Sequence, residues 1–264
     1  MKFFAKSVPS VAHPQINEDL FLADPKLQIA AVFDGVGGLS HGEKASSIAA
    51  KSITQSLKEI PQNTKPKDIK NLLEKALIEA SNKIVQQYSE CATVATVAKF
   101  VKNDRQTITL IGHVGDSRAY LFHQGKLVQI TQDDNLVLES GLLKEVIERI
   151  NQRLEQLDSE EAFKLLTPQE KKYFLSRNII TQVLGDKRPP SPHIYKVILE
   201  KDDKLILTSD GVHDNLTRSE IENIVNTYSK NLAEALVDKA YNRSKQDNIR
   251  AKPDDISAVV VDSF

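Results

Sequence analysis

The chain has 264 residues, of which 40% are hydrophobic and 27% charged, so it can bury the core of one large domain. Thirty-five basic and 36 acidic side chains give a formal net charge of -1, which argues against nucleic acid as a partner. The single cysteine, Cys91, excludes an intramolecular disulfide and a cysteine-rich zinc site.

The sequence contains no segment typical of a membrane or secreted protein. No run reaches the roughly 18 consecutive apolar residues of a membrane span, and Met1–Ser10 lacks the apolar stretch of a secretory signal. We therefore expect a soluble, cytoplasmic protein without membrane contacts, although another kind of export signal into a host cell stays open. A monomer is favoured, because the sequence shows no dimer-forming pattern.

Acidic residues border the first apolar segments. The run Ala30–Phe33 stops at Asp34, and three of the next four residues are glycine, which predicts a buried strand that delivers one carboxylate to a place where backbones approach closely. An ordinary surface Asp-Gly turn would give the same pattern. Upstream, Glu18 and Asp19 precede Leu20–Leu22, and this pair is either a charged strand edge or a holder of metal-bound water.

Two long helices and a β-rich section follow. Apolar residues spaced by three and four predict helices from Ala45 to Ile60, ending before Pro61, and from Pro66 to Tyr88. The β-rich section that follows predicts one antiparallel meander with a hairpin turn at His123–Gly125. Its strands are Ala92–Val101, Gln106–Val114, Arg118–Phe122 and Lys126–Ile130, and Asp116 lies between the second and the third.

The second half predicts a helical insertion and then a return to strands. Helical spacing begins near Leu142 and continues to Leu157, and a capping box at Thr167 starts a further helix. The strand Lys204–Thr208 leads to Asp210. A second capping box, at Thr217, then opens another helix.

Carboxylates thus recur at the ends of apolar strands drawn from distant parts of the chain. The set is Asp34, Asp116, Asp210 and Asp254, with Glu18 and Asp19 as helpers. Hard oxygen ligands favour magnesium, manganese or calcium over zinc or copper. Two such ions can activate a water and steady an in-line displacement at phosphorus, so the set predicts phosphoester hydrolysis. The chain has neither a P-loop nor a Gly-x-Ser-x-Gly elbow, which disfavours P-loop nucleotide enzymes and serine hydrolases.

Six short motifs in a fixed order carry a family resemblance. They are Asn-Glu-Asp (17–19), Asp-Gly-Val-Gly-Gly (34–38), Gly-Asp-Ser-Arg (115–118), Thr-x-Asp (131–133), Ser-Asp-Gly (209–211) and Asp-Asp-Ile-Ser followed by Val-Val-Val (254–261). Together they resemble the metal-dependent serine/threonine protein phosphatases of type 2C, the PPM family, in its bacterial form. The resemblance implies an α+β fold, a four-layer α-β-β-α sandwich of two antiparallel sheets flanked by helix pairs. It also implies a single domain over 1–264, with residues 131–178 as a helical flap beside the site.

The resemblance also assigns roles to individual residues. Asp34, Asp210 and Asp254 are implied as the catalytic acids that hold two core ions, Mg²⁺ or Mn²⁺. The Gly35 carbonyl is implied as a further ligand, and Glu18 acts through water. Asp116 is implied to hold a third, weaker ion together with Asp210. Asp19 and Asp255 are implied to lie behind the direct ligands.

The implied reaction is hydrolysis of phosphoserine and phosphothreonine in proteins by a metal-bridged hydroxide, without a phosphoenzyme. The implied partners are phosphorylated proteins, in opposition to a serine/threonine kinase. No organic cofactor is implied.

Two departures from the family pattern affect the site. Pro14 stands where the family usually has an arginine that grips the substrate phosphate, and we consider His13 as its substitute, with Lys6 as another candidate. A lone loop histidine is, however, more often merely exposed. Asp255 replaces the usual asparagine and adds a charge beside Asp254.

The missing arginine leaves alternative functions open. One is a catalytically weak pseudophosphatase that acts as a protein-binding module. The four retained aspartates oppose it, because clustered like charges are costly without cations. Another alternative is a hydrolase of small phosphoesters or nucleotides.

Overall fold

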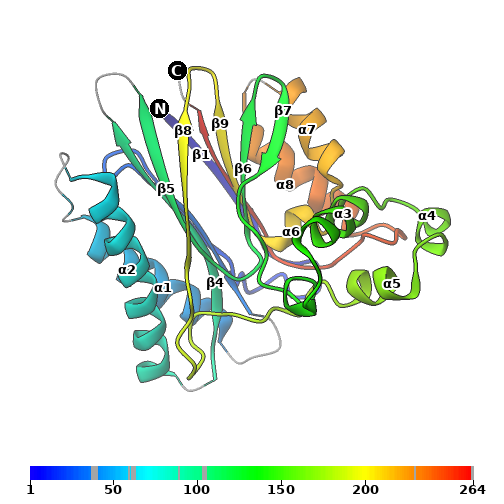
Figure 1. Cartoon of the computed structure of the whole chain (residues 1–264), viewed down its shortest axis with the longest axis horizontal. Coiled ribbons are helices and arrows are strands. Elements are labelled where there is room, and N and C mark those ends of the chain that lie inside the picture. Colours follow the sequence, from blue (N-terminus) through cyan, green and yellow to red (C-terminus); the bar gives the residue numbers. More distant parts are fainter. Residues whose placement is uncertain are drawn as a thin grey trace.

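The computed structural model describes residues 1–36, 41–58, 60, 64–88, 90–102, 106–228 and 230–262. Gly37 and Gly38 of the predicted glycine-rich turn lie outside these residues. Within the described part, two antiparallel five-stranded sheets pack against each other, and helices cover their outer faces (Figure 1). The expected α-β-β-α sandwich is confirmed.

The first sheet is covered by the two long N-terminal helices, α1 (Gly42–Lys58) and α2 (Pro66–Gln87). Side chains on β3 alternate in direction: Phe33 packs against the helices and Val32 packs against the other sheet. The strand order is β2 (Leu20–Asp24), β3 (Ile29–Gly35), β4 (Thr93–Lys102), β5 (Thr107–Val114) and β8 (His193–Leu199).

The second sheet is covered by α7 (Arg218–Thr227) and α8 (Leu232–Arg243). The short helix α6 (Asp210–His213) leaves the end of β9. The strand order is β1 (Lys2–Val8), β10 (Ile256–Asp262), β9 (Lys204–Thr208), β6 (Arg118–His123) and β7 (Lys126–Gln129).

The predicted single meander is wrong, because its four strands are divided between the two sheets. Strands β4 and β5 pair in the first sheet, while β6 and β7 pair in the second. The chain changes sheet at Gly115, whose φ of +102° is in the left-handed region that favours glycine. The predicted hairpin turn is confirmed, since Gln124 and Gly125 both have positive φ, as the turn between β6 and β7 requires.

The predicted helical insertion is present and lies outside the sandwich (Figure 1). It consists of η1 (Leu138–Ser140), α3 (Lys144–Glu155), α4 (Glu160–Lys164) and α5 (Pro168–Leu175). Helix α3 begins two residues later than the apolar spacing suggested. The insertion has small apolar clusters of its own, for example Ile147 and Ile150 with Tyr173. The capping boxes at Thr167 and Thr217 are confirmed.

Among the helices in the described part of the chain, we find none with the length and apolar character needed to span a membrane.

The helix layer over the first sheet gives a stability prediction. Leu77 on α2 is fully buried in the core between the helices and the sheet, whereas Leu72 on the same helix is 39% exposed. We expect Leu77→Ala to lower the free energy of unfolding by about 2–5 kcal/mol, because it leaves a cavity. Leu72→Ala should change it by less than about 1 kcal/mol. Urea unfolding of both variants measures this, and equal losses would contradict the described packing of α2.

Candidate metal centre

Four distant segments of the chain meet at a cleft of about 240 Å³. Asp34 and Gly35 end β3, Asp116 follows β5, Asp210 begins α6, and Asp254 precedes β10. All five residues line the cleft. The structure therefore brings together the four strand-end aspartates that the sequence singled out.

Two buried hydroxyl groups hold the backbone near Asp34. The Thr93 Oγ1 hydroxyl donates to the Asp34 carbonyl at 2.8 Å, and the Ser46 Oγ hydroxyl donates to the Glu18 carbonyl at 2.7 Å. The two hydroxyl oxygens are 3.1 Å apart. Glu18 and Asp34 are thus connected through a fully buried polar link between α1 and β4.

Gly35 allows three backbone segments to come together. A Cβ atom at Gly35 would lie 2.8 Å from the Glu18 Cβ and 2.8 Å from the Gly42 carbonyl carbon. A Cβ at Gly42 would likewise lie 2.8 Å from the Glu18 Oε1 atom. Any larger residue would force these segments apart, so the glycines set the position of the Glu18 carboxylate at the start of α1.

Asp255 binds the backbone at both ends of the segment 10–18, which leads to Glu18 beside the cleft. Its Oδ1 atom accepts from the Ser10 N–H at 2.6 Å, and its Oδ2 atom accepts from the Glu18 N–H at 2.6 Å. A carboxylate can accept at both oxygens, whereas an asparagine would offer one oxygen only. Asp255 therefore fastens both ends of the segment 10–18 beside the metal-ligand candidates.

His13 is not among the described residues that line the aspartate cleft. It is partly exposed, and its Nδ1 atom lies 3.1 Å from the Ile16 carbonyl and 3.7 Å from the Asp255 Oδ1 atom. Partial burial lowers the pKa of His13, but the Ile16 carbonyl and the Asp255 carboxylate outweigh it and raise the pKa overall. His13, Glu18 and Asp255 form a small cluster beside the cleft. The role of His13 in phosphate binding stays a prediction.

The acids in the cleft repel one another. Burial raises the pKa of Asp34 well above its ordinary value, and the charges of Asp210 and Asp19 raise it further. Burial also raises the pKa of Asp116, with Asp210 adding to the rise. The pKa of Asp210 is raised to about 7, mainly by burial, although the nearby Lys252 opposes the rise. The cluster therefore retains protons unless cations replace them.

The donor set fits a hard divalent cation. The Oδ1 atom of Asp210 is buried and has no hydrogen-bond partner among the described residues. An orphaned carboxylate oxygen of this kind is costly unless a cation takes it up. Asp34, Asp116 and Asp254 line the same cleft, and their carboxylates suit magnesium or manganese.

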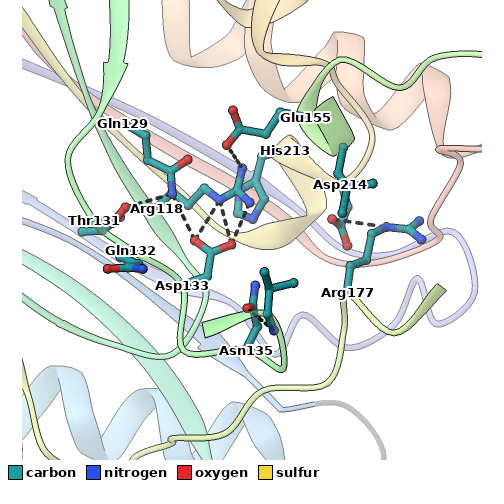
Figure 2. Close-up of polar contacts among 12 residues, drawn as sticks. Arg118, Gln129, Thr131, Gln132, Asp133, Asn135, Glu155, Arg177, His213 and Asp214 are labelled. Atoms are coloured by element: carbon teal, nitrogen blue, oxygen red, sulfur yellow. Dashed lines mark hydrogen bonds and ion pairs between the residues drawn. The ribbon is translucent and has the colours of Figure 1, made fainter. Parts of the chain in front are cut away.

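The segment 131–178, which is predicted to be a flap, contacts the sandwich through a buried ion pair (Figure 2). Arg118 donates from Nε to Asp133 Oδ1 at 3.0 Å and from a terminal nitrogen to Oδ2 at 2.7 Å. Arg118 also lies 3.4 Å from Glu155 of α3. The Gly-Asp-Ser-Arg and Thr-x-Asp motifs thus include a contact that holds this segment to β6.

Three polar residues at the site were not singled out in the sequence. Lys252 and Asn178 line the cleft, and Asp214 bonds to Lys252. Asp214 follows Asp210 by four residues, a spacing that places two side chains on the same face of a helix. That spacing was the available signal, whereas Lys252 and Asn178 belong to no periodic pattern.

Comparison with known proteins identifies the family. The family model "Protein phosphatase 2C" matches residues 12–246. The chain belongs to this family. The expected resemblance to the bacterial type 2C phosphatases is confirmed.

Named relatives and solved structures agree with this assignment. The chain is 28% identical to the serine/threonine phosphatase Stp of Listeria innocua, covering 90% of this chain and 88% of that protein. It is 31% identical to the protein phosphatase PhpP of Streptococcus pneumoniae, covering 82% and 80%. The structure matches the Mycobacterium tuberculosis serine/threonine phosphatase PstP with a TM-score of 0.73 at 23% identity, covering 99% and 98%. A structure of the PstP catalytic domain with two manganese ions matches with a TM-score of 0.72 at 22% identity, covering 99% and 97%.

The raised pKa of Asp210, about 7, gives a prediction for the pH dependence of metal affinity. Divalent cations bind the deprotonated carboxylates, so protons compete with them as the pH falls. We expect the apparent Kd for Mn²⁺ to rise between about pH 8 and about pH 6, by roughly tenfold per pH unit for each proton displaced below the pKa.

Binding of Mn²⁺ should therefore release protons from the carboxylates. Isothermal titration calorimetry with Mn²⁺ in buffers of different ionisation enthalpy measures the number of protons released. A pH-independent Kd with no proton release would show that the cluster is already fully ionised without metal.

Proposed function

We propose that this chain is a metal-dependent protein serine/threonine phosphatase whose two divalent cations, magnesium or manganese, are held by Asp34, Asp210 and Asp254. Membership of the protein phosphatase 2C family gives the enzyme class. One observation supports the position of the metal site. Carboxylates with raised pKa values lie in one cleft with Asp210, whose Oδ1 atom has no hydrogen-bond partner among the described residues. The two manganese ions in the PstP structure support the choice of metal.

The residues predicted for the two-ion core have roles in this proposal. Asp34, Asp210 and Asp254, which line the cleft, would hold the ions, and the Gly35 carbonyl would add a ligand. Glu18 would act through water. When bound, the cations supply charge neutralisation and an activated water for attack on the phosphoryl group.

The protein's own contribution is to fix the carboxylates before substrate binds. Thr93 and Ser46 hold the backbones of Asp34 and Glu18, and Asp255 holds the Glu18 amide. Rigid placement of this kind avoids reorganisation during the reaction. The buried Asp19 is one of the neighbouring acids that raise the pKa of Asp34.

We infer that the substrates are proteins phosphorylated on serine or threonine, supplied by an opposing kinase. The relatives Stp and PhpP are named as phosphatases, and no observation favours the binding-module alternative. We also infer that residues 1–264 form one phosphatase domain with 131–178 as its flap. The Arg118–Asp133 pair ties that flap to β6.

The function is tested with a phosphothreonine peptide. We expect release of phosphate with Mn²⁺ or Mg²⁺ and none with a chelator. Asp34→Asn should lower kcat/KM by about a hundredfold or more, because it removes a negatively charged ligand from the proposed metal core. Asp238→Asn, on the exposed side of α8, is the matched control and should leave the rate unchanged.

Full activity of Asp34→Asn would contradict the proposed metal site but would not contradict the enzyme class. If the folded parent protein released no phosphate with either metal, the binding-module alternative would be favoured instead. Rapid hydrolysis of small phosphoesters without hydrolysis of phosphopeptides would show that the substrates are small molecules and not proteins.

A further inference from the structure

A lysine side chain enters the aspartate cleft. Lys252 lies in the loop between α8 and β10, and its side chain is 18% exposed. Its Nζ atom bonds to the Asp210 Oδ2 atom and lies 3.0 Å from Asp254 Oδ2 and 3.1 Å from Asp214 Oδ2. One ammonium group therefore contacts three carboxylates, two of which belong to the candidate metal core.

The backbone of Lys252 is fixed to Asn215, in the turn that follows α6 and directly after Asp214. The Lys252 N–H donates to the Asn215 Oδ1 atom at 3.0 Å. The Asn215 Nδ2 group donates to the Lys252 carbonyl at 2.9 Å and to the Gly211 carbonyl at 2.9 Å. Asn215 is fully buried. The backbone of Lys252 is thus held in a fixed position by a buried residue, and its side chain enters the cleft from there.

The ammonium group and a divalent cation would need the same oxygens. Asp116 and Asp210 line the cleft, and Asp214 lies one helical turn beyond Asp210. Lys252 is bonded to the Asp210 Oδ2 atom, so a third ion held by Asp116 and Asp210 could use that oxygen only by displacing the ammonium group. The Asp210 Oδ1 atom has no protein partner among the described residues and stays available for the core ions.

We propose that Lys252 is a resident cation that takes the place of a third divalent ion, so that the chain binds two ions. This inference rests on the two-metal site of the proposed function. A fixed monovalent charge next to Asp210 and Asp254 also reduces the repulsion among the acids before metal enters.

The network extends to the flap. Arg177 follows α5, and its Nε atom lies 3.4 Å from the Asp214 Oδ1 atom (Figure 2). Asp214 is therefore shared by two cations, one from the flap and one from the cleft. Removal of Lys252 would leave the carboxylates of Asp210 and Asp214 without their ammonium partner, and together with Asp116 they would offer oxygen ligands of the type that suits a hard divalent ion.

The experiment counts bound ions without any turnover. Mn²⁺ is titrated into the chelator-treated full chain and followed by calorimetry and by electron paramagnetic resonance of the free ion. We expect two ions for the parent protein and three for Lys252→Met, with the third bound at least about tenfold more tightly than any additional Mn²⁺ on the parent. Lys239→Met, on the exposed side of α8, controls for loss of one positive charge and should bind two.

A double variant identifies the ligand. Asp214→Asn added to Lys252→Met should return the count to two, because it removes one of the three carboxylates. Lys252→Gln removes the same charge and should also bind three ions, so it replaces the methionine variant if that variant fails to fold, whereas Lys252→Arg retains the charge and should bind two. Circular dichroism establishes folding for each variant.

The outcomes separate this inference from the proposed function. Two ions in both the parent and Lys252→Met, or three in the parent, would overturn the role of Lys252 and leave the phosphatase proposal standing. No bound Mn²⁺ in the folded parent would overturn both. A third ion that appears in Lys239→Met as well would also refute the inference, since it would reflect overall charge.

Discussion

Mutual repulsion among carboxylates is the constraint on which the site depends. Asp34, Asp116 and Asp210 are placed in one cleft, and the pKa of each is raised by burial and then by the charge of its neighbours. Hydrogen bonds from hydroxyl groups and backbone amides cannot offset several like charges at such short range. Cations can offset these charges. The cluster is therefore suited to binding metal ions, and it is destabilising when no positive charge is nearby.

The sandwich supplies the close approach that this cluster needs. Gly35 brings β3 against Glu18 and the start of α1, and Gly211 brings α6 against the Asp255 carbonyl, which a Cβ atom would meet at 2.0 Å. Strands from both sheets therefore end at the same place. The helical segment is joined to this site at more than one point, since Asp133 pairs with Arg118 on β6 and Arg177 lies 3.4 Å from Asp214.

Local sequence patterns predicted most elements, the principal acids and the pairs β4–β5 and β6–β7, but they did not predict that β5 and β6 belong to different sheets. An apolar run that ends at Asp34 or before Asp210 is visible in the sequence because strand burial and the following turn are local properties. The division of the expected meander between two sheets depends on packing between β5 and β6 across the core, which no local pattern records. The role of Lys252 could not be predicted from local patterns either, because two of its partners, Asp210 and Asp214, lie about forty residues away in the sequence.

The charges of Asp255 and Lys252 act on Asp254 in opposite directions. Asp255, in place of the family's usual asparagine, accepts two backbone amides and so holds the segment that carries Glu18, but it adds a negative charge beside Asp254. The Lys252 ammonium group lies 3.0 Å from the Asp254 Oδ2 atom and so reduces the repulsion between the two neighbouring carboxylates. Both residues therefore act through Asp254, one by adding a negative charge beside it and the other by adding a positive charge.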